Sequence, residues 1–172
     1  NEVIVVTDSD EIYELISNLG GNAYKSKKEH YSGTDRIQEY IEEHVLSDNE
    51  LILNVQGDEP LIKVEAINQL GSFMLDNQFQ YGTLAKNLTD DSHLNDANKV
   101  KVLVSGNKGL DFYRTKPNIS HDDCKILHHI GVYGFTAGFL NLFAKTPQTV
   151  NEEKLKLEQL RAIENGFPIN VL

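Results

Sequence analysis

The stretch Asn54–Pro60, NVQGDEP, follows the apolar run LIL and places two carboxylates, a glycine and a proline where an expected strand ends. Carboxylates are costly to bury unless a cation or a hydrogen-bond donor meets them. Gly57 allows a ligand to approach the backbone, and Asp58 offers the hard oxygen ligand that Mg²⁺ prefers beside substrate phosphates. A turn in which the aspartate caps the next helix and Pro60 fixes its start explains the same residues equally well.

The segment YSGTDR, residues 31–36, is a second candidate for ligand binding. A small, hydroxyl-rich glycine turn that opens a helix presents free backbone N–H groups, which can hold a nucleotide base, a ribose or a phosphate. A plain helix cap by Ser32 or Thr34, with Arg36 on a solvated face, is the competing interpretation, and the residue pattern alone favours it.

Three further patterns carry weaker signals. The tripeptide DSD at residues 8–10 spells the D-x-D signature with which many nucleotide-sugar glycosyltransferases bind manganese, but Asp and Ser are also good helix caps, and capping is favoured. His128 and His129 are adjacent, so in a strand they point to opposite faces and cannot both bind one metal. The polar cluster HDDC at residues 121–124 matches no metal-binding spacing and is expected to be a loop.

Composition excludes several classes of function. The 172 residues include 16 Lys and Arg against 26 Asp and Glu, a formal net charge of −10, which argues against nucleic-acid binding because that requires clustered cations. No apolar run approaches membrane-spanning length. The single cysteine, Cys124, leaves no internal disulfide, so a protein of the reducing cytoplasm is expected. Because G-x-S-x-G, Walker and G-x-G-x-x-G motifs are absent, neither a hydrolase triad nor a dinucleotide fold has support.

The order of expected elements in the first half favours parallel strands joined by helices. VIVVT at residues 3–7 and LILNV at residues 51–55 are apolar runs typical of strands buried on both faces of a sheet. Helical spacing follows in three places, at residues 12–19, after a cap near residues 32–34, and at residues 64–78. This alternation predicts right-handed crossovers between parallel strands.

The second half adds an antiparallel excursion to this sheet. Residues 100–114 are expected to form a hairpin around a Gly-Asn-Lys-Gly turn, followed by a strand at residues 126–135 that contains two glycines. A short helix over residues 137–145 contains an apolar stretch that fits either a core helix or a subunit contact. Leucine spacing over residues 151–166 predicts one continuous helix. The architecture expected is a single α/β domain with a mainly parallel sheet.

Five motifs together resemble the 3-deoxy-manno-octulosonate cytidylyltransferases, also called CMP-Kdo synthetases. In order they are SGTDR, NVQGDEPLI, KVKVL, HHIGVYGFTAGFL and LEQLRAIENG, and they extend over nearly the whole chain. NVQGDEP with LEQLR is the most specific pair, because related sialic-acid cytidylyltransferases share the fold but lack this combination. The resemblance implies a Rossmann-like, nucleotide-diphospho-sugar transferase type of sheet with helices on both faces. It also implies that CTP activates the sugar acid Kdo, or its 8-amino analogue, giving CMP-Kdo and pyrophosphate for lipopolysaccharide.

The resemblance assigns roles to the residues that match the family's motifs. Asp58 matches the aspartate that holds Mg²⁺, and Arg114 resembles an arginine that approaches the sugar carboxylate; these two are the implied catalytic residues. The implied nucleotide-binding residues are Ser32, Gly33, Thr34, Arg36 and Gln56, and the implied substrate-binding residues are His129, Tyr133, Glu158 and Gln159. No residue is implied as a dedicated general base. The implied assembly is a homodimer.

The chain departs from the family pattern in three places. The family's opening Gly-rich loop, whose Arg and Lys hold the triphosphate, and its closing segment with a second metal aspartate have no counterpart here. TKPNISHDDC at residues 115–124 replaces a longer segment. We therefore expect residues 1–172 to be one domain truncated at both ends and inactive alone.

Two other functions stay open on the sequence. A metal-dependent nucleotide-sugar glycosyltransferase would use Asp8 and Asp10, and a non-catalytic remnant of the fold would bind partners without a nucleotide. The glycosyltransferase predicts that Asp8→Ala abolishes nucleotide-sugar binding while Asp58→Ala does little. The cytidylyltransferase predicts the reverse.

Overall fold

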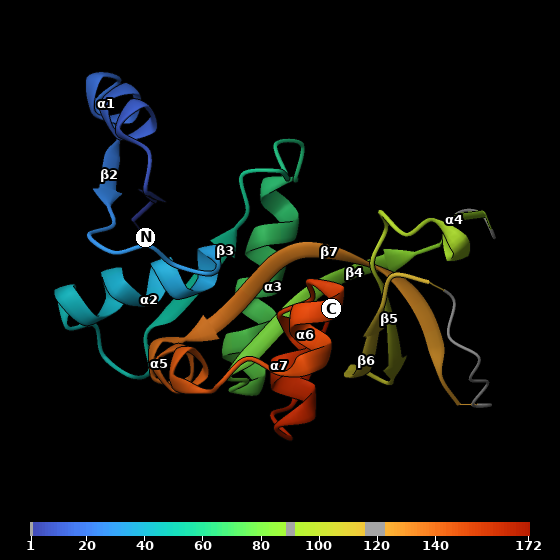
Figure 1. Ribbon diagram of the computed structural model, residues 1–172. Coiled ribbons are helices and arrows are strands. Elements are labelled where there is room, and N and C mark those ends of the chain that lie inside the picture. The colour runs from blue at the N-terminus through green and yellow to red at the C-terminus, as the bar shows by residue number, and fades with distance from the viewer. Residues whose placement is uncertain (1, 89–91, 116–122) are drawn as a thin grey trace.

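A computed structural model of the protein describes residues 2–88, 92–115 and 123–172, so that His121 and Asp122 of the predicted loop lie outside the described residues. The helices and strands in Figure 1 are β1 (Ile4–Thr7), α1 (Asp10–Asn18), β2 (Asn22–Lys25), α2 (Gly33–His44), β3 (Leu51–Val55), α3 (Val64–Asn77), β4 (Tyr81–Asn87), α4 (Ser92–Asn95), β5 (Lys101–Ser105), β6 (Lys108–Tyr113), β7 (Lys125–Thr136), α5 (Ala137–Lys145), α6 (Val150–Leu155), α7 (Gln159–Glu164) and β8 (Ile169–Val171). The predicted α/β class is confirmed. None of the helices in the described ranges is long and apolar enough to span a membrane.

Short polar side chains begin the helices where the sequence predicts caps. Ser9 accepts a hydrogen bond from a backbone N–H of α1, and Ser32 accepts one from the Asp35 N–H of α2 at 3.1 Å. Thr149 and Glu152 form a reciprocal capping box at the start of α6. The helices predicted at α1, α2, α3 and α5 are confirmed, and of these four α3 alone begins without a side-chain cap.

Six strands form the main sheet in the order β3-β7-β4-β8-β6-β5, and β5 also pairs with β7. β3 and β4 are both antiparallel to β7, so they run in the same direction, as expected for strands joined through α3. β8 is the parallel neighbour of β4. The sheet is therefore mixed, because β7 enters between β3 and β4 and makes these neighbouring pairs antiparallel. The predicted hairpin is confirmed as β5–β6, with Gly106 at a φ of 60° in its turn.

Helices cover both faces of this sheet, as predicted. On one face α3 packs over the strands, and the buried residues there are Leu70, Met74, Leu84 and Val132. On the other face α5 and α7 cover an aromatic core, whose largest members include Tyr81, Phe112, Tyr133, Phe135, Phe139 and Phe143. Val132 and Tyr133 are successive residues of β7 in different clusters, which is the alternation of a strand between two layers. The apolar stretch of α5 is thus a core helix.

β1 and β2 form a separate, two-stranded parallel sheet, which lies with α1 at one side of the molecule in Figure 1. The prediction that residues 3–7 are buried on both faces of the main sheet is wrong, since Ile4, Val5 and Val6 are only partly buried. α1 contains no buried residue. Among the described strands β1 pairs with β2 alone, so its apolar run is covered on fewer sides than that of a central strand.

The carboxylate of Glu39 on α2 anchors the segment that follows β2. It accepts hydrogen bonds from the Tyr24 hydroxyl at 2.8 Å and from the Lys27 N–H at 2.6 Å, and it lies 2.6 Å from His30 Nε2. Burial alone would raise the pKa of this carboxyl group, but these hydrogen bonds outweigh burial and lower the pKa to about 2. The small sheet is therefore attached to α2 by an ionised, buried acid.

The last predicted helix is interrupted. A continuous helix over residues 151–166 is wrong, because α6 and α7 are separate helices with Lys156 between them in the left-handed conformation, at a φ of 54°. Leu157 then turns into the core at 3% exposure. This break changes the direction of the chain just before Glu158 and Gln159, which it presents to the site described next.

Candidate active site

Segments that are distant in the sequence meet at a cleft of about 330 Å³. The start of α2, the loop after β3, the middle of β7 and the break between α6 and α7 form most of it, and the end of β6 adds a rim. Its lining residues are Ser32, Gly33, Gln56, Asp58, Glu59, Asn98, Val100, Arg114, His128, His129, Gly131, Tyr133, Lys156, Leu157, Glu158 and Gln159. Of the site residues predicted from the sequence, all except Thr34 and Arg36 line this cleft.

Arg36 and the D-x-D tripeptide do not line the cleft. Arg36 Nη2 lies 2.5 Å from the Asp8 carboxylate, Asp10 pairs with Lys25, and Ser9 caps α1. Both aspartates are engaged by cations, so the geometry favours the helix-cap interpretation of this tripeptide. Arg36 stays a predicted nucleotide ligand that this arrangement does not bring to the cleft.

The loop after β3 presents its carboxylates to the cleft. The Glu59 N–H donates to the Gln56 carbonyl at 3.0 Å, and the Glu59 carboxylate accepts from the Gly131 N–H at 3.4 Å. α3 begins after Lys63 without a side-chain cap, so the alternative in which Asp58 caps the next helix is wrong. Asp58 is exposed at the cleft and takes part in none of the hydrogen bonds or ion pairs found within the described ranges.

This donor set fits a magnesium ion that a nucleotide helps to hold. Mg²⁺ is usually bound by one or two carboxylates together with substrate phosphates and waters. Asp58 offers one exposed carboxylate, and Glu59 lies beside it in the same cleft. No group of three or more His, Cys, Asp or Glu side chains in the described part of the chain could hold a metal by itself. The residues thus fit an ion shared with substrate.

His129 is a buried, neutral imidazole. Its Nε2 lies 2.9 Å from Thr83 Oγ1, and the Thr83 hydroxyl also lies 2.8 Å from the Val132 carbonyl oxygen. Burial, with a smaller contribution from His128, lowers the pKa of His129 to about 3. His129 can therefore orient a sugar by hydrogen bonding, but it is a weak base.

Tyr133 and Gln159 form a second buried polar pair at the cleft. Gln159 Nε2 donates to the Tyr133 hydroxyl at 2.5 Å, and both residues are less than 5% exposed. Burial raises the pKa of Tyr133, so the phenol keeps its hydrogen. The Gln159 Oε1 atom is buried without a hydrogen-bond partner among the described residues, which leaves an acceptor for a ligand hydroxyl.

Glu158 joins the two sides of the cleft. Thr34 Oγ1 donates to Glu158 Oε2 at 2.7 Å, so Thr34, although it does not line the cleft, holds a residue that does. Burial raises the pKa of Glu158, and its Oε1 atom is likewise buried with no partner in the part of the chain that the structure describes. A buried acceptor at a cleft is suited to a substrate hydroxyl or amine.

Arg114 lies at the rim, but its guanidinium is engaged by the backbone. It donates to the carbonyl oxygens of Leu155 at 2.6 Å, Lys156 at 3.2 Å and Ala97 at 3.3 Å. Two of these carbonyls belong to the C-terminal end of α6 and the residue after it, so Arg114 caps this end. Lys101, whose side chain is fully buried, donates in turn to the Arg114 carbonyl at 2.5 Å.

Several cleft residues were not singled out from the sequence. Glu59 follows Asp58 directly and was within reach of the NVQGDEP motif, whereas Asn98 carries no distinguishing signal. Lys156 was not predicted as a cleft residue, because the leucine spacing places it inside a continuous helix. Its exposure at the cleft depends on the break between α6 and α7.

A family model described as cytidylyltransferase matches residues 1–169. The chain belongs to this family. The enzyme class that the motifs indicate is thereby confirmed. The other two functions left open by the sequence, a glycosyltransferase and a non-catalytic remnant, have no comparable support.

Relatives in the cytidylyltransferase family act on eight-carbon sugar acids, by their names. The chain is 39% identical to the 8-amino-3,8-dideoxy-manno-octulosonate cytidylyltransferase of Shewanella pealeana, over 99% of this chain and 71% of that protein. It is 36% identical to 3-deoxy-manno-octulosonate cytidylyltransferase 2 of Actinobacillus pleuropneumoniae, over 99% and 73%. It is 37% identical to the 3-deoxy-manno-octulosonate cytidylyltransferase of Thermodesulfovibrio yellowstonii, over 99% and 72%.

Two solved structures share the fold of this chain. A CMP:2-keto-3-deoxy-manno-octonic acid synthetase complexed with CTP superimposes with a TM-score of 0.87 at 28% identity, over 100% of this chain and 71% of that chain. The inositol-1-phosphate CTP transferase from T. maritima superimposes with a TM-score of 0.59 at 18% identity, over 99% and 64%. The second likeness shows the shared fold alone.

Proposed function

We propose that the protein is an enzyme that transfers a cytidylyl group from CTP to 3-deoxy-manno-octulosonate or its 8-amino analogue and releases pyrophosphate. The product is an activated sugar for the synthesis of lipopolysaccharide. The observation that carries this proposal is the meeting, in one cleft, of residues that the family motifs assign to nucleotide, metal and sugar. Ser32, Asp58 and Glu158 come from three distant segments and line it together. Membership of the cytidylyltransferase family supports the reaction class.

In the proposed reaction, an oxygen of the sugar acid attacks the α-phosphorus of CTP. The new bond joins this oxygen to the α-phosphorus, the bond from the α-phosphorus to the bridging oxygen breaks, and pyrophosphate leaves in line. The hydroxyl hydrogen passes to solvent, since no described cleft residue is placed as a dedicated base. CTP and the sugar acid are both anions and repel each other. The cleft lowers the barrier by holding them at reacting distance.

In this proposal, different residues of the cleft bind the nucleotide and the sugar. The N-terminus of α2 at Ser32 and Gly33 offers backbone N–H groups to the nucleotide, and Gln56 lines the same cleft. His129, Glu158 and Gln159 offer hydrogen-bonding groups to the sugar. Tyr133 and Thr34 keep two of these side chains in place through the hydrogen bonds described above.

Mg²⁺ is the proposed cofactor, held by Asp58 with the phosphates of CTP. When bound, such an ion neutralises charge on the reacting phosphates and lowers the pKa of an oxygen bound to it. The protein has a formal net charge of −10, so a cation is needed to bring anionic substrates to this acidic cleft. Asp58 is exposed at the cleft and has no hydrogen-bond or ion-pair partner among the residues that the structure describes, which supports this role.

The metal assignment is tested by two variants in the full-length protein. Asp58→Ala is expected to weaken Mg²⁺-dependent CTP binding at least tenfold by calorimetry and to lower cytidylyl transfer by about 10²-fold or more. Asp8→Ala, which removes only the ion pair with Arg36, is the matched control and is expected to retain both. Loss of binding in Asp8→Ala with retention in Asp58→Ala would support the glycosyltransferase instead, and absence of CTP binding in the unaltered protein would refute the enzyme assignment.

A homodimer in the cytoplasm is the proposed setting. The dimer rests on the family resemblance, and the compartment rests on the single cysteine. Light scattering on the full-length protein would measure the assembly. A monomeric mass at micromolar concentration would contradict the dimer.

A further inference from the structure

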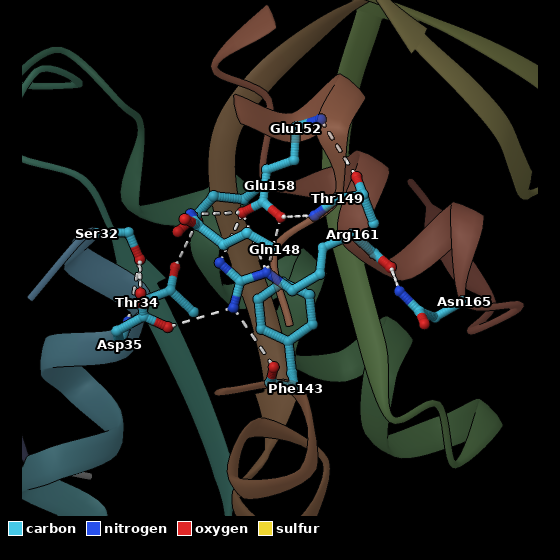
Figure 2. Close-up of polar contacts among 10 residues, drawn as sticks. All are labelled: Ser32, Thr34, Asp35, Phe143, Gln148, Thr149, Glu152, Glu158, Arg161 and Asn165. Atoms are coloured by element: carbon cyan, nitrogen blue, oxygen red, sulfur yellow. Dashed lines mark hydrogen bonds and ion pairs between the residues drawn. The ribbon is translucent and has the colours of Figure 1, made fainter. Parts of the chain in front are cut away.

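Arg161 lies behind the cleft and connects its two sides. The residue is 2% exposed and does not line the cleft. Its Nε and Nη2 atoms donate to the Glu152 carboxylate at 3.0 and 2.6 Å, while its Nη1 atom lies 3.4 Å from Asp35 Oδ1. Figure 2 shows the guanidinium reaching between these two acids, which come from α6 and α2. The guanidinium also lies 4.5 Å from the centre of the Phe143 ring.

The contact to Asp35 leads directly to the cleft. Asp35 Oδ2 accepts the Ser32 hydroxyl hydrogen at 3.0 Å, and the Asp35 N–H donates back to Ser32 Oγ at 3.1 Å. Ser32 lines the nucleotide side of the cleft and caps α2. Arg161 therefore reaches this turn through one intermediate side chain.

The contact to Glu152 fixes the opposite side. Glu152 is 3% exposed and forms the capping box of α6, whereas Arg161 belongs to α7, so their ion pair joins the two helices across the break at Lys156. Glu158 stands at the start of α7, three residues before Arg161. The ion pair thereby holds the break in the shape that presents Glu158 to the cleft.

The charges explain why an arginine is needed here. Glu152, Asp35 and the nearby Glu158 place three carboxyl groups around one guanidinium. Without that cation the acids of α2 and α6 repel each other in a poorly solvated interior, which separates the two sides of the cleft. A lysine can neutralise one acid but lacks the planar fork that reaches both.

We propose that Arg161 is a positioning residue that sets the separation between the Ser32 turn and the Glu158 turn, and hence between the nucleotide and the sugar. This inference rests on the proposed function. It extends that function to a residue that touches neither substrate. Small errors in such a separation lower the rate strongly, since a displacement of about 1 Å can cost about 10²-fold.

The test compares Arg161→Lys and Arg161→Met with Leu160→Ala in the full-length enzyme. Leu160 is a buried apolar neighbour on α7 that packs in the aromatic core, so Leu160→Ala controls for general destabilisation of this helix. Each variant is assayed for cytidylyl transfer, with kcat and KM determined for CTP and sugar separately, and for its thermal midpoint. We expect Arg161→Lys to recover most of the thermal stability lost in Arg161→Met, yet to keep a kcat/KM that is about 10²-fold below that of the unaltered enzyme.

A second cycle shows whether Arg161 acts through Asp35. Asp35→Asn alone and Arg161→Lys alone are each expected to raise KM for CTP. In the double variant the two effects on KM are expected to be non-additive. If kcat/KM follows the thermal midpoint in every variant, Leu160→Ala included, or if the two changes add independently, the positioning role is refuted. If the unaltered enzyme binds no CTP, the proposed function itself fails, and that outcome is separate from the first.

Discussion

Thr34 Oγ1 donates a hydrogen bond of 2.7 Å to Glu158 Oε2, although the two residues lie 124 positions apart in the sequence. The bond joins the turn at the start of α2 to the break between α6 and α7. It also supplies a hydrogen bond to a carboxyl group whose pKa is raised by burial. The two sides of the cleft that we propose bind the nucleotide and the sugar are therefore joined by a direct side-chain contact.

Replacing Thr34 with valine is expected to weaken this coupling. Thr34→Val keeps the shape of the side chain but removes the donor, and leaving a buried acceptor unsatisfied costs about 1–3 kcal/mol of unfolding free energy. Denaturant unfolding measures this loss, and initial rates should show a raised KM for the sugar. Thr34→Ser retains the hydroxyl and is the control. Equal stability and KM in the two variants would contradict the coupling.

The sequence predicts most local elements of this fold, because their signals are local. The range of α5 and the β5–β6 hairpin follow from caps, a glycine turn and apolar spacing. The position of β7 between β3 and β4 does not, since strand pairing is decided by contacts between distant residues. Likewise, nothing in the spacing of the leucines reveals that Lys156 adopts a left-handed conformation, because the same leucines reach the core from two short helices.

The residues of the candidate site were likewise predicted only in part. Gln56, Asp58, His129 and Glu158 are found because they belong to specific motifs, and the structure brings them to one cleft. Arg36 belongs to such a motif as well, yet it pairs with Asp8 outside the cleft. A motif identifies a residue, but the direction of its side chain depends on the charges that surround it.

Arg114 is expected to contribute to stability without any ligand. Because its guanidinium donates to three carbonyl oxygens, Arg114→Met should lower the unfolding free energy by about 1–3 kcal/mol, and Arg114→Lys should restore only part of it. Denaturant unfolding of the ligand-free protein measures this. Lys154→Met removes an exposed cation of α6 and is the control. Unchanged stability together with lost sugar affinity would show that Arg114 acts on the substrate alone.

His129 is expected to make stability depend on pH. Its pKa is about 3 when folded and about 6.5 when unfolded, so between these values the unfolded chain binds more protons and stability falls as the pH is lowered. The contribution is fully present above about pH 6.5 and falls by about 1.4 kcal/mol per pH unit below it, until about pH 3.

The measurement for His129 is a slope, which separates titration from packing. In His129→Gln the unfolding free energy should change less steeply between pH 5 and pH 6.5 than in the unaltered protein, whatever its absolute value. Identical slopes in the unaltered protein and His129→Gln would contradict the buried, neutral state.

Gly131 on β7 leaves space for the Gln56 side chain, so we expect a larger residue at position 131 to move Gln56. A Cβ atom at Gly131 would lie 2.8 Å from Gln56 Oε1, so Gly131→Ala must displace the carboxamide of Gln56, which we propose contacts the nucleotide. Because a flexible side chain yields more easily than a backbone, KM for CTP should rise several-fold while the thermal midpoint changes little. Adding Gln56→Ala to Gly131→Ala should cause no further rise in KM. Additive effects would place the influence of Gly131 elsewhere.

The twelve-residue strand β7 has a consequence for how the chain folds during synthesis. Residues 125–136 pair with β3, β4 and β5, all of which precede them in the chain. These three strands are therefore synthesised before the strand with which they pair. Non-local pairing of this kind slows folding and exposes apolar strand edges in the interval. His129 and Tyr133, two of the proposed substrate-binding residues, belong to that strand, and β8, which lies between β4 and β6, completes the sheet only after it.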